Sequence, residues 1–133
     1  MPRIGALLLL LRQHHTSLVV ARDARRAANV KDAIALSGAI ACIEAHWHTV
    51  MAAHFDEEER LIRIAEDTLE AQGVARILAE HAELRALADG PCSLEPAVRL
   101  RRFADLVVTH VRFEERVFFP QLQLHPCIVN ADA

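Results

Sequence analysis

The chain divides into four long stretches with few helix-breaking residues, and this division limits the folds that it can adopt. Its four Gly and five Pro residues gather near the ends of these stretches, where turns form. The stretches are rich in Ala, Leu, Glu and Ile, which are compatible with helix, and β-branched residues form no alternating run of strand length. The sequence therefore predicts an all-α protein with helices at about residues 4–26, 33–70, 74–88 and 95–119.

The connections between these stretches carry residues that are typical of helix ends. Asp32 and Ser93 are candidate N-caps of the second and fourth helices, and Gly73 is a candidate for closing the second. Connections of about four to seven residues place consecutive helices side by side in opposite directions. We expect an antiparallel up-down-up-down four-helix bundle over residues 1–124 and a C-terminal tail at 125–133.

Length, composition and charge exclude several classes of protein. A chain of 133 residues that is 53% hydrophobic can form one core without disulfides. Its net charge of −3 and its six Phe and Trp residues argue against nucleic-acid binding. The three cysteines (Cys42, Cys92 and Cys127) lack metal-binding spacing and suit a reducing compartment. Because no apolar run approaches 18 residues and no cleavage site follows the apolar segment 4–11, we expect a cytoplasmic protein without a membrane partner.

Histidine is the residue type in clear excess. The chain has eight His, roughly three times ordinary usage, and His is the commonest metal ligand. In two of the predicted helices a Glu follows a His by four residues, as His54–Glu58 and His110–Glu114. Residues four apart lie on one helix face, so each pair can offer a ring nitrogen and a carboxylate oxygen to one ion.

These polar residues lie within apolar stripes. At 100° per residue, Ile43, Trp47 and Val50 lie within about 40° of His54. Leu61 and Ala65 continue this stripe past Glu58. On the other helices, His110 lies among Phe103, Leu106, Val107, Val117 and Phe118, His81 among Ile77, Leu78 and Leu84, and His15 among Leu8, Leu11, Leu18 and Val19. Because an unpaired carboxylate in a core costs on the order of several kcal/mol, a pair of divalent cations is the expected partner.

Six residues are therefore the candidate metal ligands: His15, His54, Glu58, His81, His110 and Glu114. The ligand on the first helix has an alternative in His14. Leu18 follows His15 at the spacing at which Leu84 follows His81, and this parallel favours His15.

Several other His and Glu residues receive no metal role. His46 lies about 80° from the stripe, and the others are His48, His125, Glu57, Glu59 and Glu115. Glu115 would replace Glu114 if the fourth helix were slightly rotated.

The series of His15, His54-x-x-x-Glu58, His81 and His110-x-x-x-Glu114 resembles the hemerythrin-like (HHE cation-binding) domain. The likeness covers about residues 5–122 and includes the segments Glu80-His81-Ala82-Glu83-Leu84 and Phe113-Glu114-Glu115, the latter followed by Phe119-Pro120.

That resemblance implies a non-haem centre of two iron ions per chain, joined by an oxo or hydroxo bridge. Glu58 and Glu114 would bridge the ions, with His15 and His54 on one and His81 and His110 on the other. Manganese or zinc also fits these ligand types. Ferritin-like di-iron bundles use Glu-x-x-His pairs, which the sequence lacks.

One position departs from the family pattern. Oxygen-carrying hemerythrins have a second His four residues after the first on the third helix, and this chain has Arg85 there. Arg85 either closes over the site or points to solvent. With six protein ligands instead of seven, the centre favours binding, sensing or storage of iron, oxygen or nitric oxide over reversible oxygen carriage.

Two other functions stay open at this point. One is a di-iron enzyme with peroxidase-like or iron–sulfur-repair activity, and the other is a structural helical interaction domain without a redox metal. The expected partners are a small diatomic or peroxide ligand and a second copy of the chain in a homodimer. The sequence alone does not decide whether the protein is an enzyme.

Overall fold

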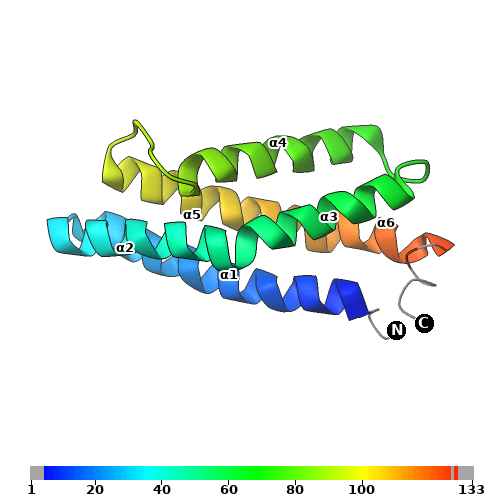
Figure 1. Ribbon diagram of the computed structural model, residues 1–133, viewed down its shortest axis with the longest axis horizontal. Coiled ribbons are helices and arrows are strands. Elements are labelled where there is room, and N and C mark those ends of the chain that lie inside the picture. Colours follow the sequence, from blue (N-terminus) through cyan, green and yellow to red (C-terminus); the bar gives the residue numbers. More distant parts are fainter. Residues whose placement is uncertain (1–4, 127, 129–133) are drawn as a thin grey trace.

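The computed structural model describes residues 5–126 and 128, which form a bundle of four helical rods (Figure 1). The first rod is α1 (Gly5–Val30), and the third is α4 (Ala71–Ala88). The second and fourth rods are composite. The second consists of α2 (Ala33–His46), η1 (Trp47–Met51) and α3 (Ala52–Ala65), and the fourth of α5 (Pro96–Phe113), η2 (Glu114–Phe118) and α6 (Phe119–Leu124). Residues 5–126 and 128 include no strand, which confirms the all-α prediction.

The three connections lie at alternating ends of the bundle. In Figure 1 the segments 31–32 and 89–95 lie at one end, and 66–70 lies at the other. Asp32 caps α2 as predicted, because its Oδ2 accepts a hydrogen bond from the backbone N–H of Ala35 at 3.0 Å. None of the helices in the described part of the chain is long and apolar enough to cross a membrane.

Two predicted helix ends are wrong. Gly73 lies inside α4, which begins at Ala71, because the chain turns earlier, at residues 66–70. Ser93 does not cap the fourth rod, since α5 begins at Pro96 and its N-cap residue is Glu95. Proline suits the first helical turn because an N–H there would have no partner within the helix.

The core consists of two apolar clusters separated by a polar layer. The first cluster includes Phe55, Leu84 and Val107, and the second includes Leu10, Leu61, Ile77 and Phe118. In the sequence, His14, Glu58, His81 and Glu114 fall between residues of the two clusters, and His54 and His110 directly precede Phe55 and Val111 of the first cluster. The bundle therefore holds its polar side chains in its middle, with apolar packing on both sides.

The buried face of α1 is one residue out of register with the predicted stripe. The predicted Leu8 is 38% exposed. The residues buried in α1 are instead Leu7, Leu10, His14, Ser17, Ala21, Ala24, Ala27 and Ala28. The leucines at 7–11 are continuous and so indicate no preferred face. The alanines that pack inside add little apolar area, and the hydrophobic pattern therefore pointed to the wrong face.

The π turns η1 and η2 shift the buried faces of the two composite rods. A π turn takes more residues than an α turn, so the residues on its two sides are rotated relative to a continuous α-helix. Met51 is buried where Val50 was expected, and His46 is buried instead of lying off the stripe. Phe119 is likewise buried, whereas the predicted Val117 is 39% exposed.

The segment after α6 is partly described. His125 and Ile128 are buried, and Ile128 packs in the second apolar cluster. Nε2 of His125 lies 3.2 Å from Oδ1 of Asp67, which follows α3. Residues 127 and 129–133, which include Cys127, lie outside the described residues. The domain boundary at residue 124 stays a prediction.

Replacement of Asp32 by Ala removes the N-cap of α2 and should lower the free energy of unfolding by about 1 kcal/mol. Urea denaturation of the two proteins measures this difference. Glu83 lies on the exposed side of α4, so Glu83→Ala is the matched control and should change stability by less than about 0.5 kcal/mol. Equal effects of the two substitutions would contradict a capping role for Asp32.

Candidate metal centre

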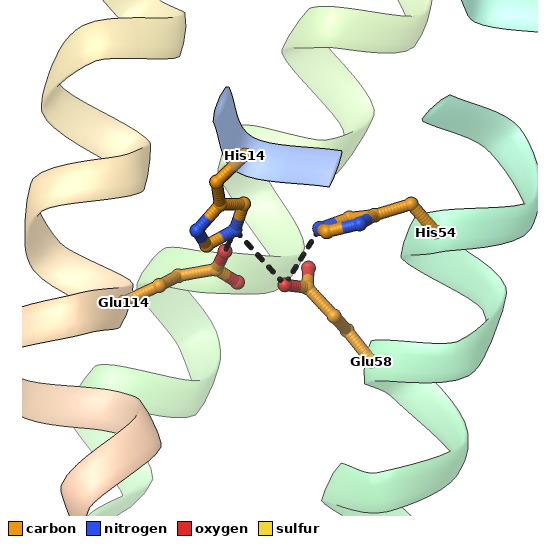
Figure 2. A group of neighbouring side chains, drawn as sticks. All are labelled: His14, His54, Glu58 and Glu114. Carbon is orange, nitrogen blue, oxygen red and sulfur yellow. Dashed lines mark hydrogen bonds and ion pairs between the residues drawn. The ribbon is translucent and has the colours of Figure 1, made fainter. Parts of the chain in front are cut away.

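Two groups of buried His and Glu side chains lie in the polar layer. The first group is His14, His54, Glu58 and Glu114 (Figure 2), and the second is Glu58, His81, His110 and Glu114. In each group, one ligand atom from every residue lies within 4.8 Å of the others. The two groups share both carboxylates, so they form adjoining halves of one centre.

All four rods contribute to this centre. His14 comes from α1 and His81 from α4, while His54 and Glu58 lie one turn apart on α3. His110 lies in the last turn of α5, and Glu114 is the first residue of η2. None of these six side chains is more than 5% exposed.

The four imidazole rings direct Nε2 toward the two carboxylates. Nε2 of His14 lies 2.8 Å from Oε1 of Glu114, and a dashed line marks this contact in Figure 2. Glu58 meets rings from both halves of the centre, because its Oε2 lies 3.0 Å from Nε2 of His54 and its Oε1 lies 2.9 Å from Nε2 of His81. Nε2 of His110 lies 3.3 Å from Oε1 of Glu114.

Two buried atoms at the centre lack hydrogen bonds, and this bears on whether the centre fits a metal ion. Nε2 of His110 and Oε2 of Glu114 make no hydrogen bond with any described residue. Nε2 of His110 has only its ion-pair contact with Oε1 of Glu114 at 3.3 Å. A buried polar atom that makes no hydrogen bond costs about 1–3 kcal/mol, and both atoms are of the kinds that bind divalent metals. The donor set therefore fits a metal ion, which both atoms could bind.

The opposite nitrogen of each ring is held by a polar side chain farther out. Each Nδ1 lies 2.8 or 2.9 Å from an acceptor oxygen, which belongs to Glu115 for His14, Gln13 for His54, Glu59 for His81 and Glu80 for His110. Such a bond fixes the ring orientation and leaves Nε2 free to bind a metal. The sequence analysis gave Glu59 and Glu115 no metal role and did not single out Gln13 or Glu80.

A regularity in the sequence could have identified these outer partners. Each is the immediate neighbour of a residue at the centre: Gln13 of His14, Glu59 of Glu58, Glu80 of His81 and Glu115 of Glu114. Successive residues are 100° apart around the helix axis. The residue next to an inner ligand therefore points toward an adjacent rod and reaches the His there. The useful signal was therefore a polar residue beside each inner ligand.

Aromatic rings cover two of the imidazoles. Phe55 stacks on His81 with ring centroids 3.8 Å apart and an interplanar angle of 11°. Phe119 lies parallel to His14, with centroids 5.2 Å apart. These contacts restrict ring rotation and keep water from the outer faces of both rings.

The structure places His14, and not His15, at the centre. The prediction that His15 faces the core is wrong, because its side chain is exposed, while His14 is 3% exposed. This result follows from the one-residue difference in the buried face of α1. The other five candidate ligands lie together as the sequence analysis expected.

Three further side chains lie outside both groups. His46 is buried, with its Nε2 2.8 Å from Oγ of Ser17. Nε2 of His48 lies 3.5 Å from Oδ1 of Asp89. Arg85 is exposed, and its guanidinium carbon lies 5.4 Å from the centre of the Trp47 ring, so it points to solvent and does not close over the site.

The carboxylates strongly affect the protonation of the buried rings. Burial alone would lower the pKa of His14, but the hydrogen bonds and charges of Glu114 and Glu58 outweigh it and raise the pKa to about 10. The pKa of His110 is also raised, because the same carboxylates outweigh its burial. Burial would raise the pKa of Glu58, yet the charge of His54 and hydrogen bonds from nearby rings hold it well below its usual value. A metal ion must therefore displace protons from this centre.

No protein-family model matches the chain, and no curated protein or solved structure is significantly similar to it. The case for a metal centre therefore depends on the geometry of the chain's own residues.

The raised pKa of His14 predicts a pH dependence of the metal-free protein. The pKa is about 10 in the folded chain and about 6.5 in the unfolded one. The stabilising contribution of His14 is thus complete below pH 6.5 and is lost as the pH rises through 10. We expect the free energy of unfolding, measured by urea denaturation, to fall over this range. The fall should be smaller in His14→Gln, and an equal fall in both proteins would count against this assignment.

Proposed function

We propose that this chain is a hemerythrin-like, non-haem di-iron protein built as an up-down-up-down antiparallel bundle. It binds two iron ions in the polar layer and there binds, senses or stores iron, oxygen or nitric oxide. The observation that carries the proposal is the pair of buried groups that share Glu58 and Glu114 and receive one His Nε2 from each rod.

The contacts of the carboxylates support a bridging role. The two oxygens of Glu58 face different halves, one toward His54 and the other toward His81. Oε1 of Glu114 contacts His14 and His110, which also belong to different halves. In the loaded protein, His14 and His54 would hold one iron, and His81 and His110 would hold the other.

The ligand set leaves room for a small molecule. Each half offers two imidazoles and two shared carboxylates, fewer donors than a six-coordinate iron accepts. When bound, iron supplies redox chemistry and open positions for a ligand. Arg85 adds no donor because it is exposed and lies against Trp47. Near-complete burial of all six side chains limits the ligand to molecules of the size of oxygen, nitric oxide or peroxide.

The protein's own residues maintain this environment. Hydrogen bonds from Nδ1 keep the four rings oriented, and Phe55 and Phe119 shield His81 and His14 from water. The two apolar clusters close the polar layer above and below. Water and larger molecules are thereby kept from the carboxylates, and electrostatic interactions with a bound ion are stronger in such surroundings.

Iron content after anaerobic reconstitution with ferrous iron tests the proposal. We expect about two iron ions per wild-type chain, because each of the two adjoining groups would hold one ion. Glu58→Gln preserves the size of the side chain but removes the shared charge, and His14→Ala removes a ligand, so both variants should lose the paired site. His15→Ala is the matched control for His14→Ala and should keep two ions.

Other results would contradict the assignment. Equal iron content in His14→Ala, His15→Ala and Glu58→Gln would show that the ions bind elsewhere. A wild-type protein that retains no iron and no manganese would instead be a structural helical domain. Turnover of peroxide by the iron-loaded protein would identify an enzyme, and stable binding of nitric oxide or oxygen without turnover would identify a binding or sensing protein.

A further inference from the structure

The outer hydrogen-bond partners differ between the two halves of the centre. His81 and His110 both donate Nδ1–H to carboxylates, those of Glu59 and Glu80. In the other half, His14 donates to the carboxylate of Glu115, but His54 donates to the amide oxygen of Gln13. Three rings therefore have a charged partner, and one has a neutral partner.

The difference lies in the charge of the acceptor and not in the length of the bond. The Nδ1–oxygen distances are 2.8 Å at His54, His81 and His110 and 2.9 Å at His14. A carboxylate accepts such a hydrogen bond more strongly than an amide and makes the imidazole a more basic ligand. It also adds negative charge near the cation. The half that contains His81 and His110 should thus bind a cation more tightly.

Gln13 also lies beside an opening on the surface. It lines a surface pocket of about 390 Å³ together with Leu9, Leu10, Ala53 and Glu57. The carbonyl oxygen of Gln13 contacts His54, so one side chain separates this pocket from a ring of the centre. The half with the neutral partner is therefore also the half next to the pocket.

We propose that the centre binds its two ions in order, first in the half of His81 and His110, and that Gln13 makes the half of His14 and His54 the weaker and more readily exchanged one. This inference rests on the proposed two-ion centre and adds to it a division of roles. Gln13 is a positioning residue that acts through His54. An ion would arrive last at the weaker half, and an ion would leave from that half.

Titration of the metal-free protein with Zn²⁺, followed by NMR of ring-¹⁵N-labelled histidines, tests the order of binding. The signals of His81 and His110 should shift during the first equivalent, and those of His14 and His54 during the second. Outer hydrogen-bond partners typically change metal affinity by about 10–100-fold, so the second ion should bind at least about tenfold more weakly.

Gln13→Glu tests the residue itself, because it gives His54 a charged partner. The second affinity should rise by about 10–100-fold, and the four ring signals should then shift nearly together. Ala53→Glu is the matched control, since it adds the same charge to the same pocket from a position next to His54. A gain in Ala53→Glu equal to that in Gln13→Glu would assign the effect to charge alone and overturn the role of the hydrogen bond.

A second pair of variants tests the stronger half. Glu80→Gln replaces the charged partner of His110 with a neutral one and should weaken the first affinity by about 10-fold or more. Glu83→Gln makes the same chemical change at an exposed position of α4 and should leave both affinities unchanged. Equal losses in the two variants would overturn the role of Glu80.

The outcomes separate this inference from the proposed function. If the wild-type protein binds two ions but His54 and His14 respond first, or all four rings respond together, the order of binding is wrong and the two-ion centre stands. If Zn²⁺ moves no ring signal and no metal binds, the proposed centre itself fails.

Discussion

The burial of Glu58 and Glu114 is the constraint on which the rest of the bundle depends. Both carboxylates are completely buried, and an unpartnered charge in a core is strongly unfavourable. Each rod therefore supplies one His whose Nε2 points toward them, and the polar residues share one layer between two apolar clusters. Even so, one oxygen of Glu114 has no hydrogen-bond partner among the described residues. The layer thus favours a bound cation.

The outer hydrogen bonds extend this constraint across the bundle. Gln13 on α1 binds His54 on α3, Glu59 on α3 binds His81 on α4, and Glu80 on α4 binds His110 on α5. Glu115 on η2 then binds His14 on α1 and completes the circuit. The contacts that orient the rings are also contacts between neighbouring rods, so formation of the centre and packing of the bundle depend on each other.

The distribution of donors also indicates how such a centre would work. The two halves have the same inner donors, and Glu58 faces both, which suits a pair of ions held close together. Their outer partners differ in charge, and this breaks the symmetry without changing a ligand. Access is narrow because the ligands are buried, although a surface pocket reaches Gln13. These properties suit a small ligand and two ions with unequal roles.

Much of this arrangement could be predicted from local sequence patterns. The distribution of Gly and Pro and the helix-forming composition indicate the four rods, and the His-x-x-x-Glu spacing places two ligand pairs on single helix faces because four residues make about one turn. The choice between His14 and His15 could not be made in this way. The leucines of α1 point in every direction, and its buried alanines carry little hydrophobic signal.

Packing against the other rods decided that choice, because it buries the face of α1 that carries Leu10, His14 and Ala21. The π turns also required the tertiary structure, since they rotate His46 and Phe119 into the interior. The outer partners lie on different rods from the rings that they hold, so no pattern within a single helix could pair them. Local periodicity therefore determined the helices and most of the candidate ligands, whereas contacts between the rods determined the face of α1 and the completed centre.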